Sequence, residues 1–109
     1  MALKKSWESS AGLLAENAYY RITSIRFDIA AGVGGADFGV YQSQAARDSG
    51  KPPAAALSFN DVAGQAFTDL MVRARALIVG GMNVYDGIRT ALYEHYKANR
   101  PEFSGATDV

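Results

Sequence analysis

The amino-acid sequence predicts an α+β fold, in which a small antiparallel β-sheet or a sandwich-like N-terminal part is followed by one or two helices packed on it. In the first half of the chain, aromatic and β-branched residues recur with an approximate period of two, as they do in strands. In the second half, apolar residues recur at intervals of three and four, as they do in helices. The period changes after Asn60, and strands followed by helices are typical of α+β domains.

The longest predicted strand is Ala18–Ile29, with the sequence AYYRITSIRFDI. Its alternation is imperfect, because Tyr20 and Ile22 share one parity whereas Ile25 and the apolar residues after it share the other. One extra residue in a strand reverses the facing of every residue that follows it. We therefore predict a β-bulge near Thr23–Ser24, which would return both sets of side chains to one buried face.

A glycine-rich stretch, Ala30–Ala36, predicts a hairpin turn, since glycine readily adopts the positive φ of tight turns. A phosphate-binding loop is the alternative, but the Gly-Lys pair of this chain is followed by Pro52 and not by serine or threonine. We expect Asp37–Gln42 to form the second strand and Ala54–Asn60 the third. Residues 43–53 predict a loop or a single helical turn, because they contain Ser-Gly and Pro-Pro pairs.

Apolar residues at helical spacing from Phe67 onward predict a helix that extends at least to Val72. The pattern between residues 72 and 78 also fits a strand, because apolar residues alternate there with arginines. Gly80–Gly81 can supply a left-handed C-cap for the helix.

The last predicted helix begins after Asn83, whose side chain can cap it, and has Asp86 in its first turn. Pro101 ends the helix, because the residue before a proline is disfavoured in the α region. The apolar stripe of this helix is predicted to contain Tyr85, Ile88, Leu92 and either His95 or Tyr96. Across the whole chain, we expect six side chains to be buried: Ile22, Phe27, Leu57, Leu70, Ile88 and Leu92.

The chain length of 109 residues predicts one domain, residues 1–109, with an N-terminal arm over residues 1–12 and a C-terminal tail over residues 101–109. No apolar stretch approaches the ~20 residues that cross a bilayer, so we expect no membrane partner. Eleven basic and eleven acidic residues give a formal net charge of zero, which argues against direct nucleic-acid binding. The chain has no cysteine, which excludes disulfides and thiolate metal sites.

The residues that catalysis or metal binding would use are scattered along the chain. His95 is the only histidine, and its neighbours give no metal-ligand spacing, so we expect a partly exposed histidine on a helix. Single acidic residues at turns and helix starts suit capping and solubility. We expect no enzyme activity, cofactor, metal or small-molecule substrate. A basic patch on the two helices is the remaining alternative, although nearby acidic residues could balance it: Arg73, Arg75, Arg89, Lys97 and Arg100.

Aromatic residues are numerous for a core of this size. Tyrosine and tryptophan are enriched at protein interfaces, although core packing could also account for several of them. We predict a partner interface that contains Trp7, Tyr19, Tyr96, Glu102 and Phe103.

Three stretches resemble a family of short structural proteins encoded by tailed bacteriophages and prophages. They are ENAYYRITSIRFD, LSFNDVAGQAFTDLM and YDGIRTALYEHYKANRPEFSGATDV, and the chain also opens with Met-Ala-Leu-Lys-Lys, as that family does. The closing motif, Pro-Glu-Phe-small-Gly-Ala-small-Asp, is the most specific part. The resemblance implies a virion structural component with a small β-rich fold and a helix.

The C-terminal tail allows two interpretations. Its single large apolar residue, Phe103, either docks on a neighbouring subunit or folds back onto the domain's own core. In the first case, deleting residues 102–109 would leave the isolated domain folded.

The function expected from this resemblance is that of a non-enzymatic structural or assembly protein of a tailed bacteriophage, in the tail or baseplate. Its partners would be other virion proteins and copies of itself in a symmetric assembly. We expect it in the virion, after assembly in the cytoplasm of the bacterial host. The alternatives are a capsid decoration protein and a free regulatory or nucleic-acid-binding domain.

Overall fold

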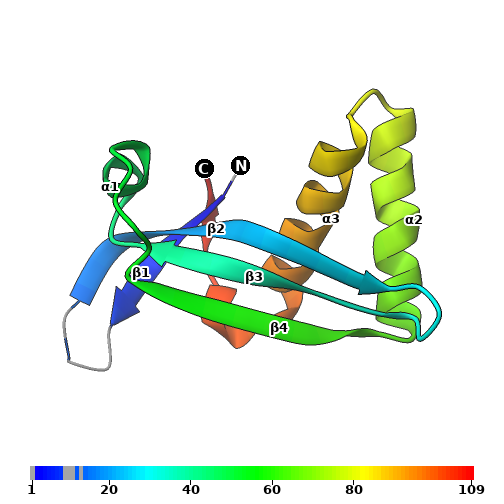
Figure 1. Cartoon of the computed structure of the whole chain (residues 1–109), viewed down its shortest axis with the longest axis horizontal. Coiled ribbons are helices and arrows are strands. Elements are labelled where there is room, and N and C mark those ends of the chain that lie inside the picture. Colours follow the sequence, from blue (N-terminus) through cyan, green and yellow to red (C-terminus); the bar gives the residue numbers. More distant parts are fainter. Residues whose placement is uncertain (1, 9–11, 13) are drawn as a thin grey trace.

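A computed structural model describes residues 2–8, 12 and 14–109, and it confirms the predicted α+β fold (Figure 1). A five-stranded antiparallel sheet has the strand order β4-β3-β2-β1-β5. The strands are β1 (Leu3–Glu8), β2 (Leu14–Asp28), β3 (Val33–Tyr41), β4 (Ala55–Ala63) and β5 (Thr107–Asp108).

The helical elements lie between and after the strands. They are α1 (Gln44–Asp48), α2 (Gln65–Val79), α3 (Val84–Asn99) and the short 3₁₀ helix η1 (Pro101–Phe103). Figure 1 shows α2 and α3 as a hairpin that rises from one end of the sheet. Helix α2 continues to Val79, so the strand-like alternation between residues 72 and 78 does not form a strand. Among the described residues, no helix is long and apolar enough to cross a membrane.

The predicted β-bulge in β2 is present. The pairing with β3 shifts between Ile22, which faces Phe38, and Ser24, which faces Asp37. Tyr20 and Ile22 are buried before the shift, and Ile25 packs against the same core after it. The extra residue therefore keeps the apolar side chains of a 15-residue strand on one face.

The glycine-rich stretch differs from its prediction, because β3 already begins at Val33 and contains Gly34 and Gly35. Only Gly32 lies in the hairpin turn with a positive φ, of 67°. A Cβ atom on Gly35 would lie 1.8 Å from the carbonyl oxygen of Phe59 in β4. Gly35 is therefore required by the close approach of two strands and not by a turn.

The core lies between the sheet and α3 and is rich in aromatic rings. Phe38 of β3 contacts Tyr96 of α3 and Phe103 of η1, with ring centroids 5.4 and 4.9 Å away. Phe59 of β4 contacts the same two residues at 5.1 and 6.1 Å. Tyr20 of β2 meets Phe103 edge to face at 5.3 Å. Phe103 thus joins three strands to the end of α3.

The six predicted core residues divide into two groups. Ile22, Leu70 and Leu92 are buried, as predicted. The other three are only half-buried although they pack against the core: Phe27, Leu57 and Ile88. They lie near the end of β2, on the edge strand β4 and in the first half of α3. In these places the helices α2 and α3 cover the sheet incompletely.

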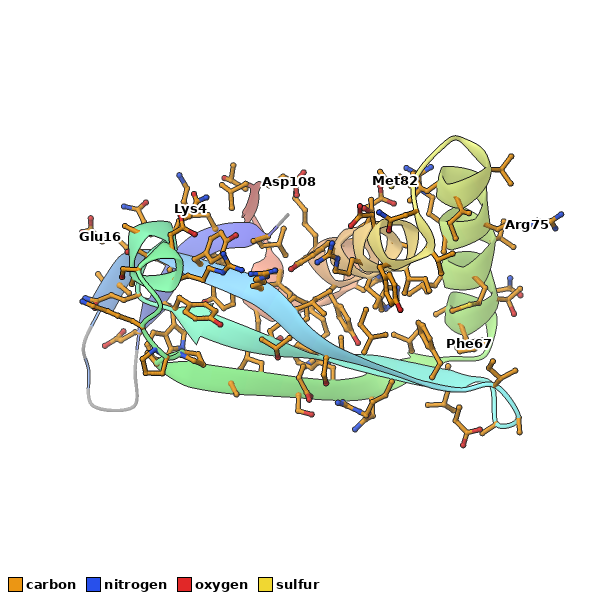
Figure 2. The ribbon with its side chains drawn as sticks, turned by 45° about the horizontal axis from the view of Figure 1, so that its top comes forward. Lys4, Glu16, Phe67, Arg75, Met82 and Asp108 are labelled. Atoms are coloured by element: carbon orange, nitrogen blue, oxygen red, sulfur yellow. The ribbon has the colours of Figure 1, made fainter. Side chains whose placement is uncertain are left out.

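The expected N-terminal arm and C-terminal tail are both integrated into the fold. Residues 3–8 of the arm form β1, which lies between β2 and β5. The N–H groups of Ala2 and Val109 each donate to the other's carbonyl oxygen at 3.0 Å. Figure 2 shows Lys4 and Asp108 on the side of the sheet that also carries α1. Residues 1 and 9–11 of the expected arm lie outside the described residues.

The face of the sheet opposite α3 carries a polar network centred on Arg26. Its guanidinium donates to Asp37 Oδ2 at 2.7 Å and to Asn60 Oδ1 at 3.0 and 3.1 Å. Ser24 also donates to Asp37 Oδ2, at 2.9 Å. Hydrogen bonds from Arg26, above all, lower the pKa of Asp37 to about 2. This network links three strands through their outward-facing side chains.

Candidate functional site

The turn between α2 and α3 has a defined shape because both helix ends are capped. Gly81, with a φ of 115°, lets the Met82 N–H donate to the carbonyl oxygen of Leu77 at 3.1 Å. The Asn83 side chain begins α3 by accepting from the Asp86 N–H at 2.8 Å. Both predicted caps are therefore confirmed, with Gly81 as the left-handed residue.

This turn and the adjoining helix ends expose large apolar side chains, and we call Val79–Tyr85 the hairpin tip. Val79 is 79%, Val84 55% and Tyr85 80% exposed, and Met82 is also exposed. Figure 2 shows Met82 at the turn, whereas Phe67 lies at the other end of α2, beside the sheet. Clustered apolar exposure of this kind is typical of protein interaction sites.

An apolar hollow of about 340 Å³ adjoins the hairpin tip. Ile25 and Phe27 of β2 line one side, and Tyr85, Ile88 and Arg89 of α3 line the other. Tyr85 belongs to both features. The hairpin tip and this hollow together form the candidate interaction surface, in which protruding and recessed apolar groups lie next to each other.

The two helices that carry the hairpin tip are held together closely. A Cβ atom on Gly87 of α3 would lie 2.6 Å from the Ile78 side chain of α2, so glycine permits this approach. Arg73 Nε and Nη2 donate to the two carboxylate oxygens of Glu94 at 2.8 and 3.0 Å. The hydrogen bonds from Arg73 are the main reason why the pKa of Glu94 is lowered.

The Asp86 carboxylate fixes the first turn of α3. It accepts hydrogen bonds from Arg89 and Asn83, and these bonds, with that of Arg89 the larger cause, lower its pKa. A carboxylate at this position also meets the positive end of the helix dipole. The capped tip therefore does not depend on a bound partner for its shape.

A second, larger groove of about 670 Å³ runs between α3 and β5. Its lining includes Thr90, Tyr93 and Lys97 of α3, and Asp108 and Val109 on the opposite side. Lys97 Nζ lies 3.2 Å from Asp108 Oδ2, so an ion pair joins the two sides. This groove is more polar at its rim than the hollow beside the hairpin tip.

Tyr93 in this groove has a structural role. Its hydroxyl oxygen accepts a hydrogen bond of 2.7 Å from the N–H of Ile22, in the part of β2 that extends beyond β1. Burial, above all, raises the pKa of Tyr93 to about 12, so the hydroxyl is neutral at ordinary pH. The side chain thereby satisfies a strand N–H that β1 does not reach.

His95 is partly exposed on α3 and lies beside Asn99. Its Nδ1 is 3.3 Å from the side-chain amide of Asn99, and burial lowers its pKa. The neighbouring carboxylate of Glu94 is already bound by Arg73. Within residues 2–8, 12 and 14–109, no group of three or more metal-ligating side chains could hold a metal ion.

The basic side chains of the two helices are mostly ion-paired. Arg75 points away from α3 in Figure 2 and is exposed. The other four pair with carboxylates: Arg73 with Glu94, Arg89 with Asp86, Lys97 with Asp108, and Arg100 with Asp61 and Glu102. Their charge is therefore balanced locally, as expected for a solvated helical face.

The five residues predicted to form a partner interface do not share an exposed surface. Tyr96 and Phe103 are fully buried in the chain's own core, because η1 folds back against the sheet. Tyr19 is buried beside Tyr41, with ring centroids 6.3 Å apart, and Trp7 packs against the core from β1. Glu102 is exposed but paired with Arg100 at 2.8 Å. The folded-back interpretation of the tail therefore applies to this structure.

The apolar periodicity of the sequence does not predict the hairpin tip. Tyr85 was assigned to the buried stripe of the last helix, but that stripe extends beyond the part of the helix that the sheet covers. The available signal was the sequence VGGMNVY, in which large apolar residues flank a glycine turn where polar residues are usual.

Comparisons with known proteins give no independent indication of a family. No protein-family model matches the chain, and neither characterised proteins nor solved structures give a significant match.

Proposed function

We propose that this chain is a non-enzymatic structural protein of a tailed-bacteriophage particle, which acts through protein–protein contacts in the tail or baseplate. The hairpin tip is the observation that favours an interaction role, because a well-capped turn exposes Val79, Val84 and Tyr85 next to an apolar hollow. Apolar side chains in a fixed geometry bind a partner without a large loss of conformational entropy.

The resemblance of three stretches to phage structural proteins supports the choice of particle. The closing motif, residues 101–108, has an internal role here, since its Phe103 completes the aromatic core. In this proposal the closing motif stabilises the fold, and the hairpin tip makes the contact with neighbouring proteins. The alternative proposals are capsid decoration and a free regulatory domain.

Quantitative mass spectrometry of purified virions tests this proposal. We expect the chain in many copies per particle, and in the tail fraction after heads and tails are separated. Copies confined to heads would favour capsid decoration. Absence from purified particles that contain their other structural proteins would contradict the proposal.

A pair of matched variants tests the surface itself. Tyr85→Ser changes the centre of the candidate interaction surface, whereas Val72→Ser changes an exposed apolar residue of α2 outside the hairpin tip. We expect Tyr85→Ser to lower the copy number per particle severalfold and Val72→Ser to leave it unchanged. Equal incorporation of both variants, with unchanged melting temperatures, would exclude the hairpin tip as the contact.

A further inference from the structure

The two edges of the sheet differ in length and in protection. β5 has only two residues, and Lys97 of α3 pairs with one of them. β4 has nine residues, which correspond to about 30 Å of strand. It pairs with β3 alone, and Figure 1 shows no described element beyond its outer edge. The main-chain groups along that edge are therefore positioned to pair with another strand.

The sequence of β4 lacks the usual protection of an edge strand. The segment AALSFNDVA contains no lysine, arginine or proline, residues that natural edge strands use to prevent pairing. Its one irregularity in the pairing with β3 is a β-bulge between Phe59 and Val62, where β4 has one residue more than the facing segment of β3. The regular part, Ala55–Phe59, is therefore the part available for further pairing.

Leu57 lies at the centre of this regular part and is less buried than the residue that faces it on β3. It faces Phe38 in the register with β3, and Phe38 is fully buried in the core. Leu57 packs against the same core but is only partly buried, because it lies on the edge strand. A strand added beyond β4 would cover this side chain.

We propose that β4 pairs antiparallel with β4 of a second copy of this chain, about a two-fold axis at Leu57. In this register Leu57 faces Leu57, Ala56 faces Ser58, and Ala55 faces Phe59. All of these side chains are uncharged, and the one charged residue of β4, Asp61, lies outside the paired part. The two sheets become one continuous sheet, and each copy covers the other's Leu57.

We choose a second copy of the chain as the partner because β4 is complementary to itself in this register. On the outer side, the small residues Ala56 and Ser58 face each other. On the core side, Leu57 meets Leu57, and the small side chain of Ala55 leaves room for Phe59. The interface differs from the hairpin tip and leaves it free. It can be tested on purified protein, so its failure would leave the proposed function standing.

The first experiment uses the absence of cysteine from the chain, since a single introduced thiol then reports on one position. Directly opposed residues of an antiparallel pair have Cβ atoms about 4.5–5.5 Å apart, within reach of a short bismaleimide. We expect Leu57→Cys to form a covalent dimer with this reagent. Ala45→Cys, at an exposed site in α1, should stay monomeric on denaturing gels. Equal cross-linking of the two variants would overturn the proposal.

The second experiment uses charge, and it keeps the core side of β4 unchanged. Ala56→Lys/Ser58→Lys places two pairs of like charges across the proposed interface, and we expect the dimer dissociation constant to rise about tenfold or more. A mixture with Ala56→Glu/Ser58→Glu should restore association. Ala45→Lys is the matched control. Light scattering measures the association, and circular dichroism confirms that each variant is folded.

The unmodified chain must itself dimerise in a concentration-dependent way for the proposal to hold. Sedimentation equilibrium that shows only monomer at millimolar concentration would overturn it. So would a dimer that the double lysine variant leaves unchanged, because the contact would then lie elsewhere.

Discussion

Helix α3 has one exposed end and one buried end, and its tyrosines show the difference. Tyr85, in the first turn, is 80% exposed, whereas Tyr93 and Tyr96 are 3% and 0% exposed. The rings of Phe38 and Phe59 pack against Tyr96, whereas Tyr85 lines the edge of a hollow. The same residue type on one amphipathic helix therefore has opposite environments.

These two environments show that a helical period identifies a face of the helix but not how much of its length other elements cover. The covered length depends on where the sheet ends and where η1 folds back. An apolar stripe that continues beyond the cover becomes exposed surface, and in this chain it contributes to the candidate interaction surface. Four predictions test the contrast between the two ends of α3.

Phe103→Ala should have the largest effect. It removes a fully buried ring that contacts Tyr20, Phe38 and Phe59, and truncation of a buried phenylalanine costs ~3–5 kcal/mol. Chemical denaturation measures this loss, with the partly exposed Val109→Ala as the control. The deletion of residues 102–109 should cost still more, because it also removes β5. A truncated chain that melts like the full chain would contradict the assignment of this segment to the core.

Tyr93→Phe should have an intermediate effect, because it leaves the Ile22 N–H without its partner at a buried position. A buried polar group that loses its hydrogen bond costs ~1–3 kcal/mol. Amide hydrogen exchange should show faster exchange at Ile22 than in the unmodified chain. Unchanged protection there would mean that the hydroxyl does not hold this part of β2.

Alkaline pH should affect the buried end of α3 through Tyr96. Burial, above all, raises its pKa from 10 to about 12, so the folded state keeps it neutral after the unfolded state has ionised. This contribution to stability is complete below pH 10 and is lost as the pH rises toward 12. Tyr96→Phe should therefore lose less stability than the unmodified chain between pH 8 and pH 11, as measured by denaturant titration. An identical loss would contradict the assignment.

Val84→Ser should have the smallest effect, because this residue of the exposed end is 55% accessible. Surface substitutions away from caps and ion pairs usually change stability by less than about 0.5 kcal/mol. Differential scanning calorimetry should show an unchanged melting temperature. A loss above 1 kcal/mol would mean that the hairpin tip packs within its own chain.

The local sequence pattern was sufficient to predict several elements of the fold. The parity break around Thr23 located the bulge of β2, and Asn83 and Pro101 marked the limits of α3 within one residue. These features depend on neighbours in sequence, which is why the sequence contains their signal. The same holds for the change from strand period to helix period near Asn60.

Contacts between distant residues could not be predicted in this way. β5 has two residues and no period of its own, and it exists because β1 offers an edge. Gly35 was assigned to a turn because the approach of Phe59 cannot be inferred from its neighbours. Tyr96 and Phe103 were predicted at a partner interface for a related reason, because their burial depends on contacts with Phe38 and Phe59, which are distant in sequence. The exposure of Tyr85 likewise depends on where the sheet ends.

The pairing of β1 with β5 also constrains when the molecule can fold during its synthesis. β1 leaves the ribosome before the other strands of the sheet, but its outer partner and Phe103 follow about a hundred residues later. Until then, Tyr20, Phe38 and Phe59 lack their contacts with the ring of Phe103. A nascent chain that carries all of β1 to β4 therefore still holds an open core, and folding is completed only after its last strand has emerged.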